Sequence, residues 1–201
     1  VAKIAHAIHF LHSEDIVHSD IKPANILISD TGDPLLCDFG VSRMLTASQS
    51  LQFSSSSSSE IRGTIAYMSK EILASQDQDA IKYSRESDVW AFGMTVYALL
   101  TKKQPYYEKA AIPIVLLAII QGSLPTPPAN TGQGPTLEYY TWKLCKRCWE
   151  PPKDRISAEL CIGYLKSMER NREKGTSNLI NPLKERQGFM YKGLYNPKVF
   201  V

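Results

Sequence analysis

The chain has 201 residues, of which 43% are hydrophobic, and a net charge of +3. This length and composition allow one sizeable hydrophobic core. The small positive charge gives no indication of a nucleic-acid or membrane partner. The longest apolar stretch, residues 112–120, contains Pro113 and is far shorter than the roughly 20 residues that cross a bilayer. Four cysteines do not form the disulfide framework of a secreted domain, so we expect an intracellular, cytoplasmic protein.

The first forty residues predict one helix and several short strands. Ile4, Ile8 and Leu11 recur at helical spacing, which predicts an amphipathic helix over residues 1–13. Short apolar runs separated by turn residues then predict brief strands. These runs are 16–17, 26–28 and 35–36.

Helices dominate the predicted structure of the rest of the chain. Ser84 is a predicted N-cap for a helix over residues 85–101, whose apolar residues lie nearly all round and therefore predict a buried central helix. These apolar residues are Val89, Trp90, Phe92, Met94, Val96, Tyr97, Leu99 and Leu100. Further helices are predicted over residues 110–121, 137–149 and 157–170. Residues 125–135 predict a loop, and residues 171–201 predict a partly disordered tail.

Two polar segments carry the residues with the clearest chemical meaning. Residues 18–25 read His-Ser-Asp-Ile-Lys-Pro-Ala-Asn, and residues 38–40 read Asp-Phe-Gly. The carboxylate of Asp20 can orient and deprotonate a hydroxyl, and the ammonium of Lys22 can neutralise a phosphoryl oxygen. The amide oxygen of Asn25 and the carboxylate of Asp38 can hold a divalent metal that bridges phosphates.

The order and spacing of these segments resemble the catalytic loop and the metal-binding loop of protein kinases. Three later segments extend the resemblance over roughly residues 1–168. They are 63–71, similar to the end of an activation segment, 88–93, similar to the start of the long buried helix, and 148–155, similar to a late helical segment. The resemblance is closest to the tyrosine-kinase-like group, although Lys22 and Thr64 favour serine or threonine acceptors over tyrosine.

This resemblance implies a mainly α fold with a few short β-strands, the C-terminal lobe of a kinase fold. It implies ATP and Mg²⁺ as cofactors and a protein substrate with a serine or threonine acceptor, and neither nucleic acid nor a membrane as partner. Asp20 and Lys22 would be catalytic. Lys22, Asn25 and Asp38 would bind the nucleotide, and Asn25 and Asp38 would hold the metal.

The N-terminal lobe of the family is missing from this sequence. Only seventeen residues precede His18, and they contain no glycine-rich loop and no strand lysine. We therefore expect residues 1–170 to be the C-lobe portion of a serine/threonine kinase, inactive alone, with residues 171–201 as a tail. The alternative is a noncatalytic, kinase-derived interaction module.

The resemblance also implies architectural contacts. His18 would pack beneath Phe39, and Asp88 would brace the backbone of the catalytic loop. Thr64 would bond Asp20 and Lys22. Glu71, which follows Ser69 and Lys70 where the family usually has Ala-Pro, would pair with Arg155.

Two features have more than one interpretation. The serine run 54–59 is either a mobile linker or a phosphorylation segment, and Ser19 stands where many kinases carry the arginine that receives an activating phosphate. Cys145 and Cys148 lack the second cysteine pair and the histidines of a zinc site, which favours packing residues. Cys37 is expected to be a buried structural thiol.

Overall fold

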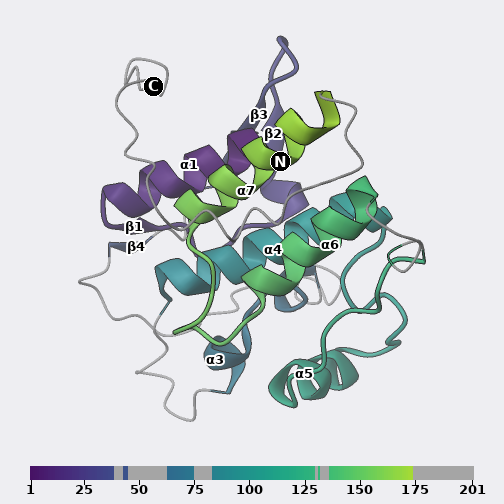
Figure 1. Ribbon diagram of the computed structural model, residues 1–201. Coiled ribbons are helices and arrows are strands. Elements are labelled where there is room, and N and C mark those ends of the chain that lie inside the picture. Colours follow the sequence, from purple (N-terminus) through teal and green to yellow (C-terminus); the bar gives the residue numbers. More distant parts are fainter. Residues whose placement is uncertain (39–42, 45–62, 75–82, 130, 132–135, 174–201) are drawn as a thin grey trace.

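The computed structural model describes residues 1–38, 43–44, 63–74, 83–129, 131 and 136–173. Within these ranges the chain is mainly helical with a few short strands, which confirms the predicted fold class (Figure 1). Phe39, the serine run 54–59 and the end of the predicted tail from residue 174 onward lie outside the described residues.

The first part of the chain forms one helix and two short antiparallel strand pairs. The helix is α1, and β2 pairs with β3 while β1 pairs with β4. The bounds are α1 Ala2–Ser13, β1 Ile16–Val17, η1 Pro23–Asn25, β2 Ile26–Ile28, β3 Pro34–Leu36 and β4 Arg43–Met44. The predicted helix and all three predicted strands are present, whereas β4 and the 3₁₀ turn η1 were not predicted. The β2–β3 register sets Ile26 opposite Leu36 and so brings the end of the first polar segment beside the start of the second.

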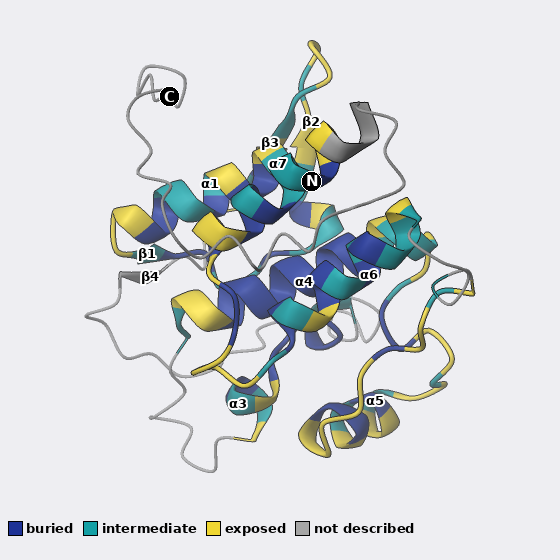
Figure 2. Cartoon of the chain, viewed as in Figure 1, coloured by how far each residue is buried: buried dark blue, intermediate teal, exposed yellow. Residues whose placement is uncertain are grey.

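Helix α4 (Arg85–Thr101) forms the centre of the core and has the predicted bounds. Ser84 caps it: the Ser84 hydroxyl accepts a hydrogen bond from the Ser87 backbone, and the Ser87 hydroxyl accepts one from the Ser84 backbone. Residues 87–97 are buried, and the helix runs through the middle of the molecule in Figure 2. The last turn leaves the core, so the prediction that Leu99 is buried was wrong, since its exposure is 51%.

Two later helices cover α4 and α1. Helix α6 (Leu137–Cys148) packs on α4, and α7 (Ala158–Glu173) packs on α1 (Figure 1). Between α4 and α6, the ring of Trp149 lies 5.5 Å from that of Trp142 and 6.1 Å from that of Tyr97, centroid to centroid. These three aromatic rings pack together between α4 and α6, and they are called the seam of aromatic residues below.

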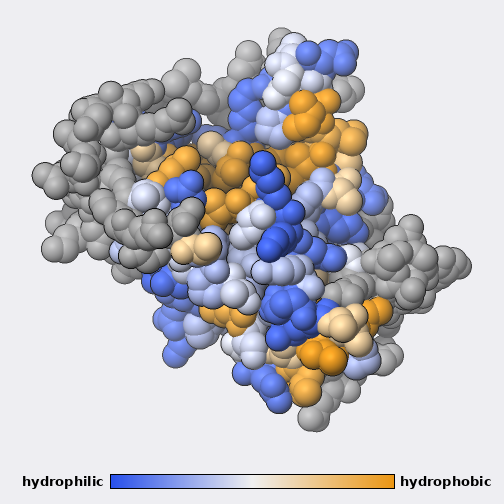
Figure 3. Space-filling view, turned by 90° about the vertical axis from the view of Figure 1, so that its right-hand side faces the viewer, coloured by the Kyte–Doolittle hydropathy of each residue, from blue (hydrophilic) through white to orange (hydrophobic). Residues whose placement is uncertain are grey.

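Helix α5 (Ile112–Ile120) and the short helix α3 (Lys70–Leu73) pack together at the far end of the molecule from α1 (Figure 1). Helix α5 has Pro113 in its first turn, where a missing backbone N–H costs nothing. Its Ile114 and Leu117 are more than half exposed, and Figure 3 shows hydrophobic residues gathered at the lower end of the molecule, at the height of α5. Among the described residues, no helix is both long and apolar enough to cross a membrane.

Candidate active site

The carboxylate of Asp88, in the first turn of α4, holds the backbone of the loop at residues 18–19. Its Oδ2 accepts a hydrogen bond from the backbone N–H of His18 at 2.8 Å, and its Oδ1 accepts one from Ser19 at 2.9 Å. Asp88 is 1% exposed, so these bonds replace water around a buried charge. They also fix Ser19 in the left-handed region at φ 67°, which few non-glycine residues adopt. The predicted bracing role of Asp88 is confirmed.

Two histidines, His12 and His18, also help to hold this loop in place. His12, at the end of α1, donates from Nε2 to Asp88 Oδ2 at 2.9 Å. His18 is fully buried; its Nδ1 accepts from the backbone of Asp20, so its Nε2 carries the proton that is donated to the Cys37 carbonyl at 3.1 Å. Sequence reasoning missed His12, whose only signal was its place on the apolar face of α1, beside Ile8 and Leu11.

The predicted catalytic residues meet around one carboxylate oxygen. Asp20 Oδ2 accepts hydrogen bonds from Lys22 Nζ at 2.7 Å and from Asn25 Nδ2 at 2.9 Å. Lys22 Nζ also donates to Thr64 Oγ1 at 3.0 Å, as predicted, while Thr64 makes no hydrogen bond to Asp20 in the described part of the chain. The carboxylate is thereby fixed in orientation beside an ammonium and a hydroxyl from a segment 42 residues away.

The two predicted metal ligands lie next to each other because of the β2–β3 hairpin. The Cys37 backbone donates to the Asn25 carbonyl at 2.9 Å, and Asp38 follows Cys37 directly. Asn25 uses its side-chain nitrogen on the carbonyl and the carboxylate of Asp20, so its amide oxygen stays available as a ligand. Asp38 is exposed, with φ 67°. One carboxylate and one amide oxygen suit Mg²⁺, which usually takes its other ligands from water and substrate phosphates.

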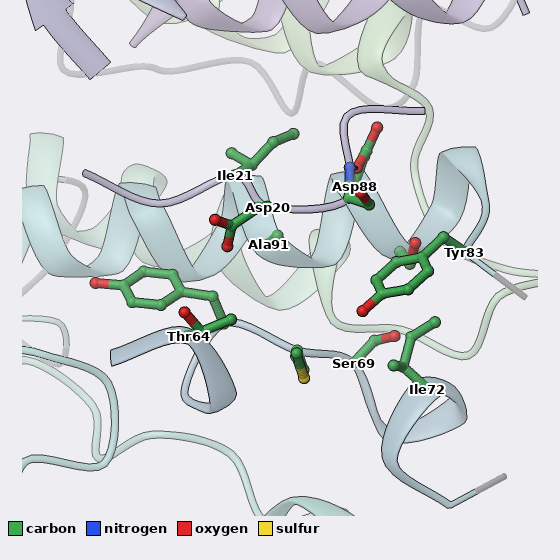
Figure 4. Close-up of a pocket in the computed structure, with 12 residues that line it drawn as sticks. Asp20, Ile21, Thr64, Ser69, Ile72, Tyr83, Asp88 and Ala91 are labelled. Carbon is green, nitrogen blue, oxygen red and sulfur yellow. The ribbon is translucent and has the colours of Figure 1, made fainter. Parts of the chain in front are cut away.

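A pocket opens beside Asp20, between the loop, the segment 64–72 and α4. Figure 4 shows Asp20 and Ile21 on the upper side of this pocket, with Thr64, Ser69 and Ile72 below them. Tyr67 also lines this pocket, and burial raises the pKa of its phenol to about 12, so it stays neutral at physiological pH. Asp20 thus borders this pocket together with Thr64.

The predicted pair between Glu71 and Arg155 is present. Arg155 Nη1 donates to Glu71 Oε1 at 2.6 Å and Nη2 donates to Oε2 at 3.3 Å. Arg155 also donates to the carbonyls of Glu86 and Glu150, and its guanidinium lies 5.1 Å from the Trp90 ring centroid. Burial by itself raises the pKa of the Glu71 carboxyl, but the hydrogen bond and charge of Arg155 outweigh it and hold that pKa below its usual value.

The cysteines behave as packing residues, with one exception. Cys145 and Cys148 are fully buried, and Cys148 Sγ lies 3.9 Å from the Sγ of Cys161. Burial raises the pKa of the Cys145 thiol far above its usual value, so it stays protonated. Cys37 is half-buried rather than buried, because it leaves β3 at the edge of the hairpin. The described residues contain no group of three or more histidine, cysteine or acidic side chains placed to hold a metal.

Comparison with known proteins agrees with this arrangement. Residues 1–164 match the protein kinase domain family. The chain belongs to this family. It is 31% identical over 187 residues to serine/threonine-protein kinase mos of Patiria pectinifera, which covers 92% of this chain and 49% of that protein. It is 34% identical over 160 residues to the phosphorylase b kinase gamma catalytic chain, liver/testis isoform, of Mus musculus, covering 79% of this chain and 37% of that protein.

A third similar kinase is serine/threonine-protein kinase 17A of Oryctolagus cuniculus, 32% identical over 166 residues, or 81% of this chain and 38% of that protein. The chain thus spans about half or less of the length of these curated relatives. The family match over residues 1–164 includes both polar segments.

Proposed function

We propose that the protein transfers a phosphoryl group from ATP to a serine or threonine hydroxyl of a protein substrate. The observation that carries this proposal is the fixed Asp20 carboxylate, 2.7 Å from the Lys22 ammonium, which also bonds Thr64. Phosphoryl transfer depends mainly on positioning and on charge stabilisation, and this cluster offers both. The names of the similar kinases support the serine/threonine class.

Each residue has a distinct proposed role. Asp20 would accept the hydrogen bond of the acceptor hydroxyl and receive its proton, because its carboxylate faces the pocket beside Thr64. Lys22 would move from Asp20 and Thr64 toward the transferred phosphoryl oxygens as a compact positive charge. Asn25 and Asp38 would hold Mg²⁺, which supplies neutralisation of the phosphate charge when bound.

We also propose that residues 1–170 correspond to the C-lobe portion of the kinase domain, and that the chain falls in the tyrosine-kinase-like group. The central α4 with its loop-bracing Asp88, and the pair between Glu71 and Arg155, support the first point. The Cys148-Trp149 spacing before Arg155 supports the second.

The test uses a form of the protein that carries the nucleotide-binding lobe of the family. That form, incubated with Mg²⁺, ATP labelled on the terminal phosphate and a mixed protein acceptor, should label serine or threonine. Asp38→Asn should abolish the label, since it removes the charge that would hold the metal. Label found on tyrosine, or no label from the unaltered protein, would contradict the proposed function.

A further inference from the structure

The acceptor side of the candidate active site is bordered by three segments. Lys22 of the catalytic loop bonds Thr64 at 3.0 Å. Directly before Thr64, a Cβ placed on Gly63 would lie 3.8 Å from Gln104 Nε2, in the connection that follows α4. The contacts of Lys22 with Thr64 and of Gly63 with Gln104 therefore connect the loop at 18–25, through the start of segment 63–69, to the segment 101–107.

These segments are strongly unbalanced in charge. Together they contain one carboxylate, Asp20, and three lysines: Lys22, Lys102 and Lys103. Asp20 is already bonded to Lys22 and Asn25, so it offers little to a cation on a substrate. A peptide with basic residues near its acceptor would meet no acidic side chain of these segments other than Asp20.

The two lysines directly before Gln104 are exposed and can contact a ligand. Lys102 ends α4 in the left-handed conformation, at φ 56°, and both Lys102 and Lys103 are exposed. Lys103 Nζ lies 4.2 Å from the ring centroid of Tyr107, itself 44% exposed, which holds this ammonium on the surface beside an aromatic face. Within the described residues, neither lysine has an acidic side chain within 4.0 Å, whereas nearby Lys109 is 3.8 Å from Glu108.

We propose that Lys102 and Lys103 select acceptor sequences that carry acidic residues, so that the substrate class is a serine or threonine in an acidic peptide. This inference rests on the proposed function, because it takes Asp20 as the centre at which the acceptor hydroxyl binds. An extended peptide advances about 3.3 Å per residue, so acidic side chains a few residues from the acceptor would reach the end of α4. The attraction is electrostatic and exposed, so it should weaken as salt is added.

The experiment measures peptide binding by the full chain, which separates it from catalysis. Three fluorescent peptides of equal length hold one central serine, flanked by glutamate, glutamine or lysine. We expect affinity to fall in that order at low salt. Lys102→Glu together with Lys103→Glu should weaken binding of the glutamate peptide by about five- to tenfold, the combined effect of reversing two exposed ion pairs. Lys153→Glu, at an exposed lysine between α6 and α7, should change it by less than about twofold.

Several results would overturn the proposal. They are equal affinity for the three peptides, no binding of any of them at millimolar concentration, no effect of the double charge reversal, or an equal loss with Lys153→Glu. Each variant should have the melting temperature of the unaltered chain, which verifies that the substitution changed the surface charge and not the folding. If the acidic peptide binds through these lysines but the longer protein never phosphorylates it, the proposed function fails while the lysine site stands.

Discussion

At the scale of single residues, the loop at residues 18–25 depends on a buried carboxylate, that of Asp88. Asp88 accepts hydrogen bonds from His12, His18 and Ser19 with two oxygens, inside the core. A buried carboxylate is tolerated because three donors and the N-terminal end of α4 compensate its charge. The hydrogen bonds of Asp88 therefore hold the loop in the conformation that presents Asp20.

Asp88→Asn tests this support without any assay of activity. Asparagine has one oxygen, and its NH₂ group would face a donor, so at least one buried N–H would lose its partner. We expect a loss of about 2 to 4 kcal/mol in the free energy of unfolding. Urea denaturation measures it, and Asp154→Asn, at an exposed position, should stay within about 0.5 kcal/mol of the unaltered chain. An equal loss of stability from the two substitutions would show that the hydrogen bonds of Asp88 do not stabilise the fold.

At the scale of elements, the approach of α4 to the end of α6 depends on a glycine. A Cβ on Gly93 would lie 2.5 Å from the Cys148 Cβ and 2.8 Å from the Trp149 Nε1. The first contact is with a Cβ, which moves only if the helices move apart. Gly93 therefore allows the seam of aromatic residues to close.

Gly93→Ala should destabilise the chain although alanine favours helix. Overpacking of about 1 to 3 kcal/mol outweighs the gain of about 1 kcal/mol in helix propensity. Gly163 is the matched control: it lies in α7 with nothing within 4 Å of its would-be Cβ, so Gly163→Ala should be neutral or stabilising by up to about 1 kcal/mol. Thermal melts of both variants measure the contrast. A Gly93→Ala variant as stable as Gly163→Ala would contradict this packing.

The elements also show what the sequence could and could not reveal. Helix α4 was predicted with its bounds because a serine cap precedes a long apolar pattern. The same pattern could not show where the helix leaves the core, so Leu99 was misplaced. Helix α3 was missed because four residues are too short to show a period. Strand β4, Arg43–Met44, was missed because it is not an apolar run like the Ile16–Val17 of β1.

The candidate site was foreseen to a greater extent. Asp20, Lys22, Asn25 and Asp38 came from spacing and resemblance, but their roles stay predictions. The contact of His12 with Asp88 depends on how α1 packs against α4, which no local pattern encodes. The cationic surface at Lys102 and Lys103 was likewise hidden, because only the folded chain brings Gln104 beside Gly63.

At the scale of the whole molecule, Glu71 and Arg155 join segments 84 residues apart. The side chain of Arg155 is 1% exposed and that of Glu71 is 31% exposed. Arg155→Ala should cost about 3 to 5 kcal/mol, because it leaves the carboxylate and two carbonyls without their donor. Glu71→Ala should cost less, since Arg155 keeps both carbonyls. The double variant should cost less than the sum.

A double-mutant cycle in urea measures this coupling. The exposed pair of Arg85 and Asp15 is the control and should show a coupling of about 0 to 1 kcal/mol. Because the folded-state pKa of Glu71 is lowered, the stabilisation is present above its unfolded pKa of about 4.3 and is lost as the pH falls through the lower folded value. Additivity within about 0.3 kcal/mol at pH 7 would refute the pairing.

Nucleotide binding is also a property of the whole molecule. Residues 1–201 contain no glycine-rich loop and no strand lysine of the kinase type, so most groups that would position ATP are not among them. We expect this chain alone to bind Mg-ATP more weakly than about 100 μM and to transfer no phosphate. Calorimetry measures the affinity. Tighter binding, or labelling of a generic acceptor, would show that these residues hold the nucleotide by themselves.

The central claim, that Asp20 acts on the acceptor hydroxyl, is tested most directly by steady-state kinetics of Asp20→Asn. The assay uses the form with the nucleotide-binding lobe, and Asp154→Asn is the control for a neutralised exposed carboxylate. The account predicts a kcat lower by about two to four orders of magnitude with a nearly unchanged KM for ATP, because Asp20 contacts the acceptor rather than the nucleotide. A kcat for Asp20→Asn close to that of the unaltered protein would contradict it.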